Sequence, residues 1–307
     1  MEATFRWTLV TAIAPVAWGT NYYVTREFLP AHHPLYGAAF RALPAGLVLL
    51  ALCRTLPRGS WWWKALVLGV LNMGGFFALV YVAAQLLPTS LASTVMATSP
   101  LAMMLIAWPL LSERPRPTHL LGAVAGLGGV CLMLLSGTAR VAPGGVLASA
   151  AAMAMSSLGY VLAKRWRCEA GVLASTSWQL VAGGLLLLPL AAVVEGTPPA
   201  LDAPAALGFG YVTVVATALA FAAWFAGLRH LPASTVGLVG LLNPVTGVLL
   251  GTALAGEALT LRQYCGLVLT LAGILLSRPT ARKPPPGVPG VSAGASPAKP
   301  VTRRSAP

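Results

Sequence analysis

The sequence is short of charge, because Asp, Glu, Lys and Arg together make up only 9% of its 307 residues. An ordinary soluble domain carries about 25% of such residues. Apolar runs of about twenty residues recur along the chain, and each is long enough to cross a bilayer as a helix. A single soluble domain of this length cannot bury so much apolar surface. We therefore expect an all-α integral membrane protein.

Metal-binding and catalytic patterns are also missing. The four cysteines stand far apart and form no CxxC pair, which supports neither a zinc site nor a redox motif. No GxSxG or HExxH pattern is present, and the four histidines fall in expected loops or at the ends of expected spans. We therefore expect no catalytic residue, no metal and no cofactor. The net charge of +13 comes without interleaved aromatic and basic residues, so nucleic-acid binding is not expected either.

Ten apolar stretches are separated by short connectors that are rich in turn-forming residues. The expected spans are residues 7–24, 35–53, 64–84, 89–111, 118–135, 144–163, 173–194, 205–227, 234–255 and 261–277. The first is interpreted as an uncleaved helix rather than a signal peptide, because many further spans follow it. The segment 278–307, dense in Pro, Gly, Ser and Ala, has little to bury and is expected to be a disordered cytoplasmic tail.

Basic residues are distributed unevenly between the two sides of these spans. If the N-terminus is placed inside, sixteen Lys and Arg residues fall on the inner side. Only Arg26, Arg41, Arg140 and Arg262 fall on the outer side. Basic residues gather in loops that stay in the cytoplasm. We therefore expect a multi-pass protein of the cell membrane, in contact with lipid, with both termini cytoplasmic.

An internal repeat relates the two halves of the chain. With one spacing of 144 residues and no gap, the matched pairs are Pro88 and Pro232, Pro100 and Pro244, Glu113 and Glu257, Gly122 and Gly266, and Gly129 and Gly273. Each half holds five expected spans, so the halves must cross the membrane in opposite directions. Inverted repeats of this kind are typical of secondary transporters, whose substrate site lies near the midplane.

The sequence resembles the EamA family of the drug/metabolite transporter superfamily over about residues 7–277. In the first half the matching residues are Trp18-Gly19, Asn21, Arg41, the segment 100–113 and the segment 122–129. In the second half they are Trp224, Pro232-Ala233-Ser234, Asn243-Pro244, Gly256-Glu257, Thr260, Gln263, Gly266 and Gly273. The first half departs from the second in having Ser99 where the second has Asn243.

This resemblance implies ten transmembrane helices, a central cavity, and export or uptake of small metabolites or drugs. The halves would be residues 1–140 and 141–277, each an EamA-like five-helix repeat. We expect a membrane transporter that works by alternating access on a small-molecule substrate. Two rivals are a non-transporting assembly partner and an intramembrane enzyme. The Gly122/Gly126 and Gly247/Gly251 pairs permit close helix packing, within the chain or in a homodimer.

Polar and aromatic side chains at the depth of the spans are the candidates for substrate binding. They are Trp18, Asn21, Tyr22, Tyr81, Ser99, Ser156, Tyr160, Trp224 and Asn243. Pro100 and Pro244 are expected to kink their helices, because proline removes a backbone donor. Freed carbonyls must then face protein or a water-filled cavity.

Three charged residues leave alternatives open. Glu113 and Glu257 follow spans 89–111 and 234–255, where each either anchors a turn or contacts a gate. Arg41 either serves function within the membrane or extends to the nearby interface, and Gln179 holds the corresponding place in the second half. All seven acidic residues fall in expected loops or at the ends of spans. The sequence therefore predicts facilitated diffusion or exchange rather than coupling through a midplane proton relay.

Overall fold

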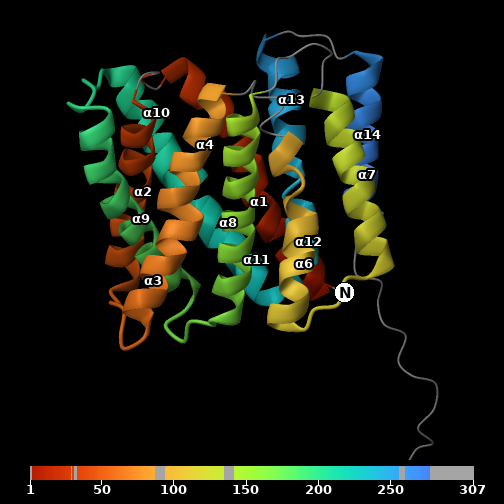
Figure 1. The fold of residues 1–307 in the computed structure, drawn as a ribbon, viewed down its shortest axis with the longest axis horizontal. Helices are drawn as coiled ribbons and strands as arrows, with labels where there is room; N and C mark the ends of the chain where they lie inside the picture. The colour runs from red at the N-terminus through yellow and green to blue at the C-terminus, as the bar shows by residue number, and fades with distance from the viewer. Residues whose placement is uncertain are drawn as a thin grey trace, which may run out of the picture.

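A computed structural model describes residues 2–28, 30, 33–86, 94–134, 142–255 and 260–276. Within these ranges it leaves out the side chains of residues 2, 3, 21–23, 25–27, 81, 84, 85, 251, 252, 254 and 255. The predicted disordered tail lies outside the described residues. All regular elements in the described part are helices, so the all-α prediction is confirmed there. They stand roughly side by side in one bundle (Figure 1).

The helices of the first half are α1 (Glu2–Phe28), α2 (Pro34–Cys53), α3 (Trp61–Gly69), α4 (Gly75–Leu86), α6 (Ser99–Leu111) and α7 (Pro117–Leu134). Those of the second half are α8 (Pro143–Arg165), α9 (Val172–Val194), α10 (Ala203–Thr213), α11 (Ala220–His230), α12 (Ala233–Val239), α13 (Leu242–Ala255) and α14 (Leu261–Leu276). Two π-helical segments, η1 (Val70–Gly74) and η2 (Val214–Leu219), continue α3 into α4 and α10 into α11.

Eight helical stretches of the described chain are long and apolar enough to cross a membrane. They are Pro34–Cys53, Trp61–Val80, Thr94–Leu111, Pro117–Leu134, Pro143–Arg165, Val172–Val194, Ala203–His230 and Ala233–Leu250. The last predicted span coincides with the shorter apolar helix α14, and the first with the 27-residue α1. The chain is therefore a multi-pass membrane protein, and the count of ten spans stays a prediction.

Local sequence explains where several helices begin and end. Pro34, Pro117 and Pro143 each open a helix, where the missing N–H would have no partner in any case. The carboxylate of Asp202 caps α10 by accepting a hydrogen bond from the backbone N–H of Ala205 at 2.8 Å. Arg54 follows α2 in the left-handed conformation with φ 48°, which ends that helix sharply.

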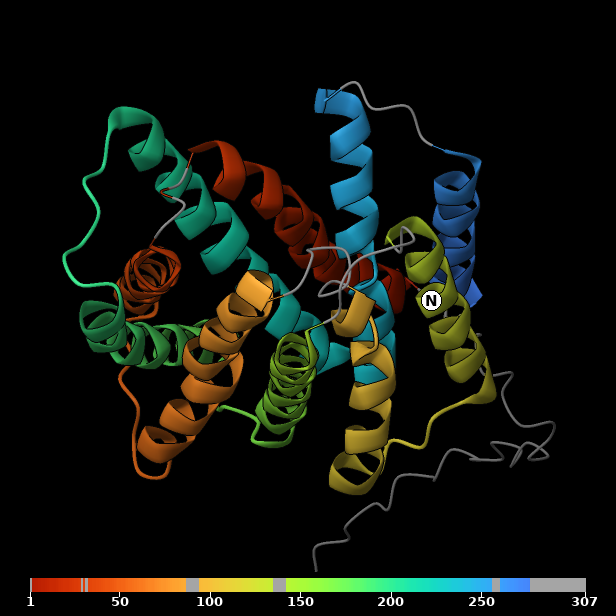
Figure 2. The ribbon, with the colours of Figure 1, turned by 45° about the horizontal axis from the view of Figure 1, so that its top comes forward.

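The ends of the helices define two ends of the bundle. The N-terminus and connectors 54–60 and 166–171 lie at what we call the lower end, and connector 195–202 lies at the upper end (Figure 1). Helices α7 and α14 run side by side along one flank, as Figures 1 and 2 both show. Most connectors are short, so each chain crossing returns directly into the bundle.

Glycines bring helices of the two halves together in reciprocal pairs. A Cβ on Gly46 of α2 would lie 2.7 Å from the backbone N of Val181 in α9, and one on Gly184 would lie 2.9 Å from the backbone N of Leu43. Each residue of this contact stands 138 positions from its counterpart. Backbones this close require glycine, since any larger side chain must displace the facing helix.

The same reciprocity joins α7 to α14. A Cβ on Gly129 would lie 2.5 Å from the carbonyl O of Gly266, and one on Gly273 would lie 2.5 Å from the carbonyl O of Gly122. These are the glycines that the 144-residue repeat matches to one another. Of the predicted GxxxG pairs, Gly122/Gly126 therefore packs within the chain, whereas a Cβ on Gly247 would meet no atom within 4 Å.

Candidate functional site

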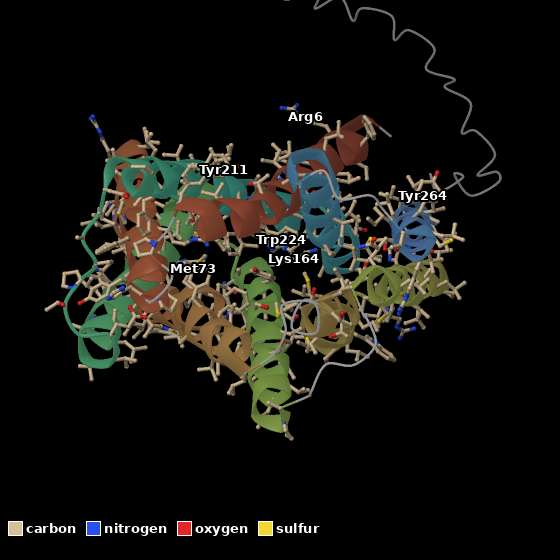
Figure 3. The ribbon with its side chains drawn as sticks, turned by 90° about the horizontal axis from the view of Figure 1, so that it is seen from above. Arg6, Met73, Lys164, Tyr211, Trp224 and Tyr264 are labelled. Atoms are coloured by element: carbon tan, nitrogen blue, oxygen red, sulfur yellow. The ribbon has the colours of Figure 1, made fainter. Side chains whose placement is uncertain are left out.

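A cavity of about 260 Å³ lies between helices from both halves. Its wall begins near the upper end, with Arg41 in the second turn of α2 and Val80 in α4. Toward the lower end it reaches Tyr160 of α8 and Trp224 of α11. Seen from above, Trp224 lies near the middle of the bundle (Figure 3). The cavity therefore extends from near the upper end past the middle of the bundle and stops at an aromatic floor.

Aromatic side chains form that floor. The ring of Trp224 lies 5.2 Å from that of Trp18 and 5.4 Å from that of Tyr160, centre to centre. Trp18 also lies 5.1 Å from Phe221. Below these rings, Phe225 and residues of α11 and α12 belong to the same buried cluster. The tilted and edge-on ring pairs add about 0.5–1.5 kcal/mol each beyond area burial.

Arg41 supplies a charge to the wall. Its Nε donates to Thr217 Oγ1 at 2.9 Å, and its Nη2 donates to the carbonyl O of Ala216 at 3.3 Å. Its guanidinium carbon lies 5.0 Å from the ring centre of Phe77. Of the two alternatives for this residue, the structure supports a place in the interior, because the side chain points to η2 and lines the cavity.

The π-helical segment η2 presents the carbonyl that holds two of these side chains. Ala216 O accepts from Arg41 and also from Trp18 Nε1, the latter at 3.1 Å. In an α-helix this carbonyl would be directed along the helix axis to a residue four positions ahead. The wider π turn changes that register, and π-helical bulges often occur at functional sites for this reason.

Two buried polar atoms of the wall have no hydrogen-bond partner among the described residues. They are the donor Nε1 of Trp224 and the acceptor Oδ1 of Asn243. A buried polar group without a partner costs roughly 1–3 kcal/mol. Both atoms belong to residues that line the cavity.

The helices that carry Pro100 and Pro244 are interrupted beside the cavity. Residues 97–98 form a turn before α6, and residues 240–241 form a turn between α12 and α13. Met96, Ala97 and Ser99 line the cavity from one interruption, and Gly240, Leu241, Asn243 and Pro244 line it from the other. Non-helical backbone at this depth is tolerated where it borders protein or a cavity.

An ionic cluster lies below the aromatic floor. The Nζ of Lys164 forms an ion pair with Glu113 Oε1 at 2.5 Å and donates to the carbonyl O of Leu231 at 2.5 Å. Glu113 Oε2 accepts from the backbone N–H of Ala233 at 2.8 Å, which caps α12. Glu113 thus ties the end of α6 to two elements of the other half, rather than holding only its own turn.

The structure brings together many of the residues singled out from the sequence. Trp18, Ser99, Ser156, Tyr160, Trp224, Asn243 and Pro244 all line the cavity. Pro100 instead packs against α12, where a Cβ on Gly237 would lie 3.0 Å from its Cα. The side chains of Asn21, Tyr22 and Tyr81, and the whole of Glu257, lie outside the described residues.

Sequence reasoning missed the apolar part of the wall and one cation. Phe76, Phe77 and Phe221 line the cavity, but apolar residues are equally expected toward lipid or in a packed core. Lys164 is one of the sixteen basic residues expected on the inner side, and the sequence gives no sign that its side chain is only 10% exposed. No signal within α8 alone distinguishes it from Arg165 beside it.

Comparisons with known proteins identify what the chain is similar to. Residues 5–135 and 143–278 each match the EamA-like transporter family. Protein PecM of Dickeya dadantii is 36% identical over 86% of this chain and 89% of its own length. The uncharacterized inner membrane transporter YedA of Escherichia coli is 26% identical over 85% of this chain and 87% of its own. A solved crystal structure matches the fold with a TM-score of 0.78 at 23% identity, over 89% of this chain and 96% of its own.

Proposed function

Because the chain belongs to the EamA-like transporter family, we propose that its cavity carries a small organic solute across the cell membrane by alternating access. A membrane transporter of the drug/metabolite superfamily is what the family match and the transporter relatives support directly. The proposal adds a binding site, an inverted repeat of residues 1–140 and 141–277, and a mechanism.

Three relationships support an inverted repeat. The family match occurs twice, once in each half. The α2–α9 and α7–α14 contacts are reciprocal, as a twofold axis passing between each pair requires. The π-helical segments η1 and η2 begin at Val70 and Val214, which have the 144-residue spacing of the repeat. A five-helix unit repeated in this way must invert, and inverted units can exchange conformations to open one side at a time.

The asymmetry of this structure supports alternating access. The aromatic floor and the cluster of Lys164 and Glu113 lie below the cavity, and the described residues place no such ionic cluster above it. With the lower end in the cytoplasm, as the basic residues of its connectors favour, the aromatic floor and the ionic cluster lie on the cytoplasmic side of the cavity. The opposite state would require the Lys164–Glu113 contact to separate.

One observation carries the proposal: both halves, and both helix interruptions, contribute to one cavity with unpartnered polar atoms. Purified protein in proteoliposomes loaded with a mixture of small metabolites tests it, with release followed by mass spectrometry against protein-free vesicles. We expect wild-type protein to release a small set of compounds selectively. Trp224→Ala should slow that release by roughly tenfold or more, since a buried aromatic anchor is removed.

Trp63→Ala is the matched control, because this tryptophan is 51% exposed on the surface of the bundle. It should release the same compounds at the wild-type rate. If pure wild-type protein releases nothing beyond the protein-free vesicles, the transporter proposal fails and the assembly-partner alternative gains support.

A further inference from the structure

Arg41 and Gln179 hold corresponding places in the two halves, 138 residues apart, and each reaches a π-helical segment of the other half. Arg41 donates to Ala216 in η2, whereas Gln179 Oε1 accepts from Asn72 Nδ2 in η1 at 2.8 Å. Ala216 and Asn72 have the 144-residue spacing of the repeat. One structural role is therefore filled by a cation in the first half and by a neutral amide in the second.

The uncharged contact between Gln179 and Asn72 is buried and does not reach the cavity. Gln179 is 1% exposed and Asn72 0%, and neither lines the cavity. A Cβ on Gly159 of α8 would lie only 2.1 Å from Asn72 Oδ1, so α8 packs directly over the pair. The contact between α9 and the π-helical segment η1 is thus made without any charged side chain. The fold alone does not explain why its counterpart carries a guanidinium.

The corresponding contact of Arg41, by contrast, lies in the wall of the cavity. Arg41 is the only charged residue among the described residues that line it. Its contacts with Thr217 Oγ1 and Ala216 O fix the guanidinium at the wall, on η2. An ionisable side chain within a membrane span is costly to keep and usually serves a ligand or ion. The planar, forked donors of arginine match a carboxylate in two parallel hydrogen bonds.

The other lining residues and the volume of the cavity indicate what the uncharged part of such a ligand is. Trp18, Tyr160 and Trp224 give the cavity an aromatic floor, and Phe77 adds an aromatic ring to the wall. Its volume is about 260 Å³. An apolar cavity of about 150 Å³ is enough to hold benzene, so there is room here for a ring with a short substituent.

We propose that the solute is a flat, ring-containing monocarboxylate whose carboxylate is bound by Arg41 while its ring lies on the aromatic floor of Trp18, Tyr160 and Trp224. Among the described residues that line the cavity, Arg41 supplies one positive charge, which one carboxylate matches. This inference deepens the proposed function and rests on it, because it takes the ligand of the cavity to be the transported solute. The preference for an anionic ligand is measured as binding to the purified protein, so its measurement does not require transport.

Three ligands with the same ring test the charge directly: phenylacetate, its neutral amide phenylacetamide, and the cation phenethylamine. Trp18 and Trp224 report binding to purified protein through their fluorescence. Phenylacetate should bind at least about tenfold more tightly than phenylacetamide, as expected for hydrogen bonds to a charged group. Phenethylamine should bind more weakly than either.

Arg41→Gln gives the first half the residue of the second, and should abolish the preference for phenylacetate over phenylacetamide. Arg41→Lys keeps the charge and should retain part of the preference. Arg229→Gln is the matched control, an exposed arginine at the end of α11 that lies outside this cavity. It should bind all three ligands as the wild type does.

The inference is overturned if wild-type protein binds phenylacetate no better than phenylacetamide, undetectable binding included. It is also overturned if Arg41→Gln keeps the preference. Should Arg41→Gln fail to fold, the wild-type series and Arg41→Lys decide the question. Anion-selective binding without any flux in proteoliposomes would refute the proposed function alone, and selective flux of neutral solutes without anion preference would refute this inference alone.

Discussion

Lys164 Nζ and Glu113 Oε1 lie 2.5 Å apart, and this ion pair joins the end of α8 to the end of α6. Glu113 also caps α12, so one carboxylate connects three elements below the aromatic floor. Both side chains are largely withdrawn from solvent, at 10% and 27% exposure. Losing either partner leaves the other poorly compensated.

A double-mutant cycle on this pair should therefore show coupling. We expect Lys164→Ala and Glu113→Ala each to lower the free energy of unfolding of the purified protein. The double variant should lose less than the sum, by roughly 1–3 kcal/mol. Strictly additive losses would mean that the pair contributes no net interaction. Arg165→Ala is the control, since it stands beside Lys164 and ends α8.

The glycine contact between α2 and α9 makes a steric prediction. Gly46→Val should lower the free energy of unfolding by about 1–3 kcal/mol, because its Cβ would lie 2.7 Å from the backbone N of Val181. Gly37→Val is the control on the same helix, as its Cβ would meet no atom within 4 Å. We expect it to change stability by less than about 0.5 kcal/mol. Equal effects in thermal unfolding of the two variants would contradict the close packing.

The orientation of the bundle can be tested with reporter fusions. Gly196 lies in the connector between α9 and α10 at the upper end, and the basic residues favour the lower end as cytoplasmic. A fusion at Gly196 should report the outer compartment, and one after Pro307 should report the cytoplasm. If both fusions report the same compartment, the alternation of spans is wrong.

Cys168 provides a pH-dependent probe of the lower end. It lies in connector 166–171, and burial raises the pKa of its thiol. A raised pKa leaves less thiolate at neutral pH, and the thiolate is the reactive form. With the other three cysteines changed to Ser, maleimide labelling of Cys168 should be slow at pH 7 and should reach half its maximal rate above pH 9.0, the ordinary pKa of the thiol. Half-maximal labelling below that pH would show that the thiol is not protected by burial.

Much of the helical fold was predictable, because apolar runs alone specify spans in lipid. The eight long apolar helices coincide with predicted spans, and the Gly122/Gly126 pair predicted close helix packing. The π-helical segments were not predictable. Nothing in the residues 70–74 or 214–219 marks a change from α to π, which arises from how neighbouring helices pack.

The cavity was predictable in its polar half only. Trp18, Ser156, Tyr160 and Asn243 stand out because polar groups are rare in a span. Phe76 and Phe77 do not, since an apolar residue has the same sequence signature toward lipid, core or cavity. Lys164 and Glu113 come from different halves, so only the tertiary structure brings their opposite charges together.

The last prediction concerns energy coupling. A proton-coupled carrier needs a titratable group that is exposed in turn to each side of the membrane. Three of the described carboxylates have structural partners at helix ends: Glu113 with Lys164, Glu195 with the backbone N–H groups of Leu35 and Tyr36, and Asp202 with Ala205. His119 lies in the first turn of α7, at the end of a span as expected, but its side chain is buried, being 3% exposed. Its Nδ1 lies 2.9 Å from Ser234 Oγ.

We therefore expect facilitated diffusion or exchange. In proteoliposomes, an imposed pH gradient should change the initial rate of solute entry by less than about twofold and should drive no accumulation above equilibrium. His119→Asn keeps a hydrogen-bonding side chain beside Ser234 but cannot bind a proton near neutral pH. It should transport at the wild-type rate at pH 6 and at pH 8. Accumulation that a protonophore abolishes would refute uncoupled transport. Loss of that accumulation in His119→Asn, with entry down the gradient retained, would identify His119 as the coupling group. Its loss in Glu113→Gln alone would instead place coupling in the ion pair with Lys164.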